Sequence, residues 1–179
     1  MMRFKPLAIL AATLALAGCL VSDDPLFDAA SGAAAPLAPG RYQACAEPAE
    51  DEPDCQLIVV SLRDDGAYEF LAPDDDLIVA RFHPMGGPDY VVQFADDDGE
   101  GYRYFWAHAK AETMKLVMIW CEELPAALRE TMKRDGLIAQ EEASSTCKAL
   151  RREAAVMAAA AYRDGAATPD SFLMLSPAP

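Results

Sequence analysis

Two histidines and five cysteines are the side chains of this sequence with the widest chemical range. His83 precedes Pro84, and His108 lies in an aromatic run. Either imidazole could serve as a general base beside one of the many carboxylates, as in hydrolases. The sequence has no nucleophile-elbow, metallopeptidase, phosphate-loop or dinucleotide motif. We therefore predict no catalytic residue, and a hydrolase using His83 or His108 is the less favoured hypothesis.

Four of the cysteines predict a pair of disulfides. Four cysteines permit three pairings. We favour Cys45 with Cys55, which flank an acidic segment, and Cys121 with Cys147, which would join a strand to a helical region. A metal site is the alternative, but the sequence has no Cys-x-x-Cys pair. We therefore expect neither a metal nor another cofactor.

The fifth cysteine ends an export signal. Arg3 and Lys5 precede an apolar run from Leu7 to Leu16, which is too short to span a bilayer and is typical of a signal peptide. The four residues Leu16-Ala17-Gly18-Cys19 resemble the lipobox of bacterial lipoproteins at every position. The resemblance covers about twenty residues. It leaves the family of the remaining chain open.

The lipobox resemblance implies a modification and an address. In that family the cysteine thiol receives a diacylglyceryl group, the signal peptide is cleaved before it, and the new amino terminus is usually acylated. It therefore implies a signal peptide over 1–18, a lipid on Cys19, and a protein anchored in a bilayer without spanning it. In the Gram-negative members of that family an Asp directly after the lipidated cysteine tends to retain the protein at the inner membrane, so Leu20 at this position implies the periplasmic face of the outer membrane. Lipidation of Cys19 would leave an even four cysteines for disulfides.

Behind Cys19 the sequence predicts a tether and one domain. Residues 19–39 contain three prolines and show no period of 2 or 3.6, which indicates a lipidated amino terminus followed by a flexible tether. We assign a single domain to 40–165 and a tail to 166–179. The apolar stretch 171–176 in this tail is predicted either as an edge strand or as a frayed end.

The domain is predicted to be α+β, an antiparallel β-meander of about six to seven strands followed by two carboxyl-terminal helices and stapled by two disulfides. Helical spacing occurs from Leu124 to Met132 and from 146 to 164. Asp64-Asp65-Gly66 is the clearest hairpin signal. The strand-like runs cover 41–46, 56–62, 67–71, 77–82, 90–95, 102–109 and 115–120.

Two clusters admit a binding interpretation. Alternation places Tyr102, Tyr104 and Trp106 on one face, where with Trp120 they could line a ligand pocket, although core packing is favoured. The run from Asp96 to Gly101 resembles the start of an EF-hand loop. Ala107 stands where that loop needs its bidentate Glu, so a solvated turn is the better interpretation.

The charge of the chain limits its partners. The formal net charge is −14, and it becomes −16 when Arg3 and Lys5 leave with the signal peptide. Such a balance excludes non-specific nucleic-acid binding. Acidic runs at 47–54, 74–76 and 96–100 would attract a cationic protein partner, although they would also simply favour solubility.

The leading hypothesis is a membrane-anchored, non-enzymatic accessory or binding component of the cell envelope. The alternative is an inhibitor of a cationic peptidoglycan hydrolase, because bacterial lysozyme inhibitors include exported, disulfide-bonded, β-rich lipoproteins. The chain is similar to them in Tyr42-x-x-Cys45 and in Gly101-Tyr102 followed by Phe105-Trp106.

Overall fold

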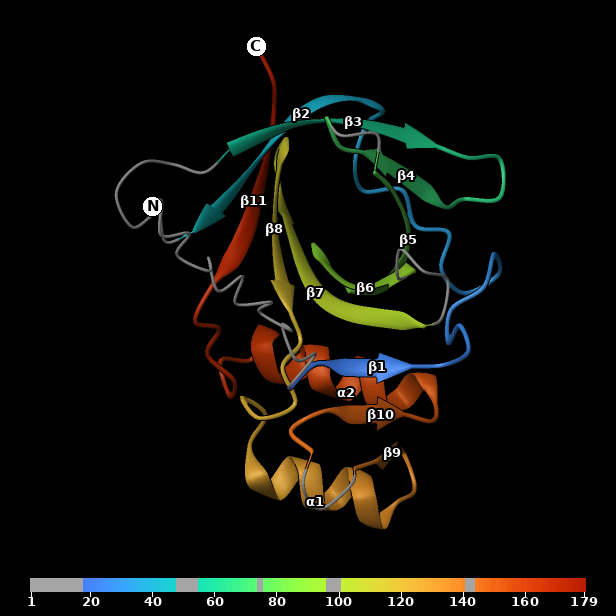
Figure 1. The fold of residues 1–179 in the computed structure, drawn as a ribbon, viewed down its shortest axis with the longest axis vertical. Helices are drawn as coiled ribbons and strands as arrows, with labels where there is room; N and C mark the ends of the chain where they lie inside the picture. The colour runs from blue at the N-terminus through green and yellow to red at the C-terminus, as the bar shows by residue number, and fades with distance from the viewer. Residues whose placement is uncertain (1–17, 48–54, 74–75, 96–100, 141–143) are drawn as a thin grey trace, which may run out of the picture.

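Eight antiparallel strands form a closed barrel in the computed structural model, which describes residues 18–47, 55–73, 76–95, 101–140 and 144–179 (Figure 1). Hydrogen bonds run around the ring in the order β2, β3, β4, β5, β6, β7, β8 and β11, and β11 pairs with β2 to close it. The strands are β2 (Gly40–Glu47), β3 (Cys55–Leu62), β4 (Tyr68–Leu71), β5 (Leu77–Gly86), β6 (Asp89–Ala95), β7 (Tyr102–Lys110), β8 (Thr113–Met118) and β11 (Phe172–Pro177).

Three short strands and two helices lie against one side of the barrel (Figure 1). Strand β1 (Leu20–Ser22) pairs with the start of β7 and, in parallel, with β10 (Cys147–Ala149), which pairs with β9 (Ile138–Ala139). Helix α1 (Ala126–Arg134) contacts β9, and α2 (Arg152–Arg163) contacts β6, β7 and β10. Strands β3 and β4 lie on the side opposite the helices.

Alternation along the strands divides the apolar side chains between two cores. Val92 of β6 and Leu116 of β8 point into the barrel. Their neighbours Val91 and Val117 point outward, under the helices. Because α2 offers mainly alanines to this outer core, it can lie close to the sheet. Strands buried on both faces explain why 90–95 and 115–120 are apolar at nearly every position.

The predicted α+β fold is wrong, because the protein is mostly β. Residues 171–176 are neither an edge strand nor a frayed end, since β11 is hydrogen bonded to β2 on one side and to β8 on the other. The second helix begins at Arg152 rather than at 146, because Cys147–Ala149 pairs with β1. Strands therefore occur between and after the helices, and the meander closes into a ring.

Both favoured disulfide pairings are confirmed. Cys45 and Cys55 are directly opposite each other on β2 and β3 and are bonded there. Cys121, just after β8, is bonded to Cys147 of β10. The second bond holds the small sheet of β1, β10 and β9 to the barrel wall.

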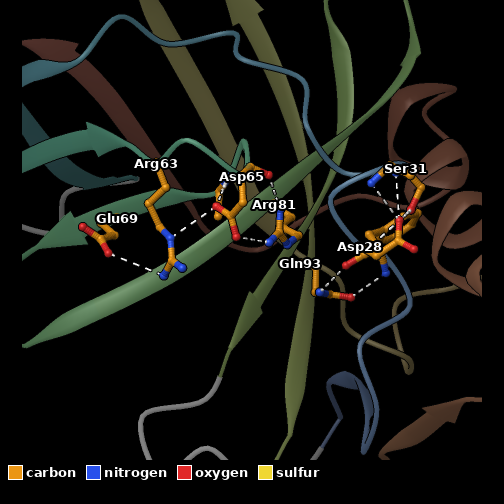
Figure 2. A network of polar contacts seen from close by, with 10 residues as sticks. Asp28, Ser31, Arg63, Asp65, Glu69, Arg81 and Gln93 are labelled. Atoms are coloured by element: carbon orange, nitrogen blue, oxygen red, sulfur yellow. Dashed lines mark hydrogen bonds and ion pairs between the residues drawn. The ribbon is translucent and has the colours of Figure 1, made fainter.

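Residues 20–39, predicted as a flexible tether, are packed against the barrel. Leu20, Phe27 and Leu37 are buried. Gln93, itself 3% exposed, accepts the backbone N–H groups of Leu26 at 2.7 Å and Phe27 at 2.9 Å, and it donates to the Phe27 carbonyl at 3.1 Å. This side chain thus replaces the ladder bonds that an irregular segment lacks. Figure 2 shows Gln93 directed at this segment, close to the Asp28–Ser31 turn.

The same segment closes one end of the barrel. Leu37 lies in the inner core, where the hydroxyl of Tyr68 donates to its carbonyl at 2.6 Å and accepts its N–H at 3.0 Å. Burial raises the pKa of Tyr68, so the hydroxyl stays neutral and able to donate. Leu37 and Tyr68 form a floor across this end.

The β3–β4 hairpin is fixed beside the floor. Gly66 has φ +78°, and a Cβ there would lie 2.6 Å from that of Ala33, so the turn requires glycine for two reasons. Arg81 of β5 donates to the Asp65 carboxylate at 2.6 Å, and Arg63 lies 3.2 Å from the same carboxylate (Figure 2). The Ala67 N–H and then Arg81 lower the pKa of Asp65.

Replacing Gln93 by Leu should weaken the packing of residues 20–39, the docked segment, against the barrel. The change leaves the amides of Leu26 and Phe27 without their acceptor, and the cost of buried unsatisfied groups predicts a loss of about 1–3 kcal/mol in the free energy of unfolding. Urea unfolding measures it. Gln43→Leu, at an exposed position of β2, is the control and should change little. Equal losses in both variants would contradict the role given to Gln93.

Candidate functional site

The end of the barrel opposite the Leu37–Tyr68 floor contains an apolar pocket, which we call the mouth pocket. Its volume is about 250 Å³. Ten of its lining residues are apolar and come from β2, β3, β4, β5, β6, β8, β11 and the residue after β4. They are Ala44, Ala46, Ile58, Phe70, Ala72, Ile78, Phe94, Leu116, Leu173 and Leu175.

The pocket exists because small and large side chains alternate around the ring. Each lining residue of a strand occupies an inward position, and the alanines of β2 leave space that the larger side chains opposite do not fill. Gln56 is the one polar residue of the lining. A pocket of this composition binds an apolar group and offers few polar contacts.

The pocket was missed by the sequence analysis. Its inward positions follow from the alternation of the predicted strands, but Leu173 and Leu175 complete the wall from β11, whose place in the ring the sequence did not predict. Leu173 of this wall is 39% exposed, and this exposure of an apolar side chain at the pocket can be recognised only in the structure.

The connections between strands at this end are acidic. The ends of β2, β4 and β6 lie at the mouth pocket, and the three acidic runs of the sequence connect them to the next strands. Glu47 and Asp76 of these runs are described, and Asp76 is exposed. Residues 48–54, 74–75 and 96–100 lie outside the described residues, and so does most of the EF-hand-like run.

Cys19 lies beside the mouth. Its backbone forms an isolated antiparallel β-bridge with Trp120, just beyond β8, and its carbonyl accepts the Cys147 N–H at 3.2 Å. Its Sγ is 3.4 Å from the Sδ of Met118, the last residue of β8. The residue is 2% exposed and takes part in neither disulfide.

His108 has a carboxylate partner. Its Nδ1 donates to Asp89 at 3.0 Å, and Trp106 Nε1 donates to the same oxygen at 3.0 Å. His108 and Trp106 lie on outward positions of β7, on the other face of the strand from inward Phe105 and Ala107, and Asp89 is opposite His108 on β6. Within the described part of the chain, no serine, threonine or cysteine is hydrogen bonded to His108. The pair resembles the orienting half of a hydrolase site without its nucleophile.

His83 has a structural role. Its Nδ1 donates to the Ser31 carbonyl at 2.5 Å, and its ring stacks on Phe27 with centroids 4.8 Å apart. Both contacts hold the docked segment of residues 20–39. The structure thus gives the two histidines different surroundings and does not combine them in one site.

Three of the four aromatic side chains that were predicted as a possible pocket lining, Tyr102, Tyr104 and Trp106, lie in or pack against the core under the helices. Tyr104 bonds to Ser22 at 2.6 Å, and burial raises its pKa to about 12. Tyr162 of α2 accepts the backbone N–H of Trp120 at 3.0 Å and donates to Glu123 at 2.6 Å. Burial, more than Glu123, raises the pKa of Tyr162. None of the four predicted aromatics lines the mouth pocket.

The described residues contain neither a metal site nor a membrane-spanning helix, and comparison with known proteins points to no further site. In the described ranges, no three His, Cys, Asp or Glu side chains are grouped so that they could hold a metal ion. No helix among those residues has the length and apolar character needed to cross a membrane. Comparison with protein-family models, with curated proteins and with solved structures gave no match.

The mouth pocket should bind an aliphatic probe when Cys19 is replaced by Ala. A fluorescent fatty acid titrated into the Cys19→Ala chain measures the affinity. Adding Ala44→Phe should weaken binding by at least about tenfold, equivalent to about 1.4 kcal/mol, because the ring fills the pocket. Ala139→Phe, at an exposed position of β9, is the control. Unchanged affinity with Ala44→Phe would show that the probe binds elsewhere.

Proposed function

We propose that this protein is a non-enzymatic, lipid-anchored binding component of the cell envelope whose barrel holds an apolar group in the mouth pocket. The single observation that carries the proposal is the pocket itself, an apolar cavity open at one end of a barrel that is closed at the other. Barrel mouths of this kind commonly hold ligands. Catalysis is less favoured, because the His108–Asp89 pair has no nucleophile bonded to it among the described residues.

The anchor rests on the lipobox residues and places the barrel close to the lipid. Strand β1 begins at Leu20, directly after Cys19, and pairs with both β7 and β10. A lipid on Cys19 would therefore hold the barrel at the bilayer surface with no intervening tether. We place the protein at the periplasmic face of the outer membrane, on the sequence signal at Leu20.

Metabolic labelling tests the anchor. Cells grown with a fatty-acid analogue should incorporate the label into the wild-type chain and leave Cys19→Ala unlabelled, because the thiol is the attachment point. Cys45→Ala with Cys55→Ala, which removes the disulfide between β2 and β3, is the control for a changed cysteine and should label fully. Equal labelling of wild type and Cys19→Ala would remove the basis of the anchor.

An inhibitor of a cationic peptidoglycan hydrolase is the second candidate. The favouring observation is that β2, β4 and β6, from whose ends the three acidic runs lead, all end at the mouth pocket. A basic protein could place an apolar side chain in the pocket while its cationic residues meet the acidic ones. Such a contact combines steering by charge with a buried anchor side chain.

Titration against lysozyme tests this candidate. The Cys19→Ala chain should inhibit a cationic lysozyme at physiological salt, where the Debye length is about 8 Å, since contacts inside a binding site are screened little. Ala44→Phe should weaken inhibition, and Ala139→Phe should not. Binding seen only at low salt would indicate non-specific attraction and would eliminate the inhibitor.

A further inference from the structure

The thiol of Cys19 lies next to the wall of the mouth pocket. Its Sγ touches the side chain of Met118 at 3.4 Å. Met118 and Leu116 are two residues apart on β8 and so share its inner face, about 7 Å from each other. Leu116 lines the pocket. An acyl chain attached to this sulfur and lying along the inner face of β8 therefore passes only the side chain of Met118 before it reaches the pocket.

The path between the sulfur and the pocket is apolar. Met118 is opposite Phe105 in the pairing of β8 with β7. The ring of Phe105 packs edge-on against Phe94, with centroids 4.6 Å apart, and Phe94 lines the pocket. Cys19 itself is buried against this surface. An acyl group on Cys19 would thus begin in apolar surroundings and continue in them.

The size of the pocket suits part of an aliphatic chain. Its volume of about 250 Å³ lies below the range of about 300–1,000 Å³ that is usual for complete drug-sized ligands. Its lining offers one polar side chain, Gln56, so the pocket selects for apolar surface and not for a head group. Methylene groups that enter such a pocket leave water or lipid without needing a hydrogen-bond partner.

We propose that the mouth pocket holds an aliphatic chain and that this chain is an acyl group carried by Cys19 of the same molecule. The proposal rests on the lipid attachment proposed above and names the apolar group that the barrel holds. The lipoprotein family carries two or three acyl chains on this residue. One chain in the barrel leaves the remainder for the bilayer, so the molecule is anchored by fewer chains than it carries.

Photo-cross-linking of the full-length lipoprotein tests the proposal. Cells expressing the chain are supplied with a fatty acid that bears a diazirine, the purified protein is irradiated, and cross-linked peptides are identified by mass spectrometry. We expect wild type to give cross-links to the peptides of β8 and β11 that contain Leu116 and Leu173. Ala44→Phe should reduce these cross-links several-fold, and Ala139→Phe should leave them unchanged. Ala46→Phe is a second filling variant if Ala44→Phe does not fold.

The outcomes distinguish a failure of this proposal from a failure of the lipid attachment on which it depends. Label on Cys19 with cross-links only to lipid, or only outside the barrel, would overturn the proposal and leave the anchor intact. Wild type without label would overturn both. Pocket peptides of the wild type that are cross-linked to a lipid not attached to Cys19 would show that a free lipid supplies the chain, which overturns its assignment to Cys19.

Discussion

Closure of the ring by β11 is the constraint on which the other features of this structure depend. Strands β2 and β8 would both expose a row of unpaired backbone groups without it, and such edges are sites of aggregation. The inserted strand also contributes to the inner core, since Leu175 lies opposite Ala44 on one side and Met114 on the other. The mouth pocket has a complete wall only because this strand is present.

The sequence allowed prediction wherever a local pattern determines the structure. The strands from β2 to β8 alternate or are continuously apolar and are separated by turn residues, so their positions could be predicted to within a few residues. Gly66 marked the β3–β4 hairpin. The pairings of Cys45 with Cys55 and Cys121 with Cys147 followed from where these residues stand relative to the strands.

The failures share a physical cause, which is that they depend on partners distant in sequence. Residues 171–176 have no local pattern that distinguishes a strand inside a ring from one at an edge, because the difference is whether a second strand pairs with it. Residues 20–39 show no hydrophobic period. The backbone groups of Phe27 and Leu37 bond to single polar side chains, Gln93 and Tyr68, and not to the backbone of a neighbouring strand. The one available signal was a glutamine at position 93 within an otherwise apolar strand. Its burial makes sense once its three backbone partners are known.

Strand β11 also follows the other seven strands of the ring in the sequence. Its partner β2 lies near the start of the domain, and pairing two segments so far apart carries a large loop-closure entropy, which slows folding. A ribosome that still holds the residues of β11 prevents the ring from closing. The order of strands therefore delays completion of the barrel until β11 is available, and β2 and β8 keep unpaired edges until then.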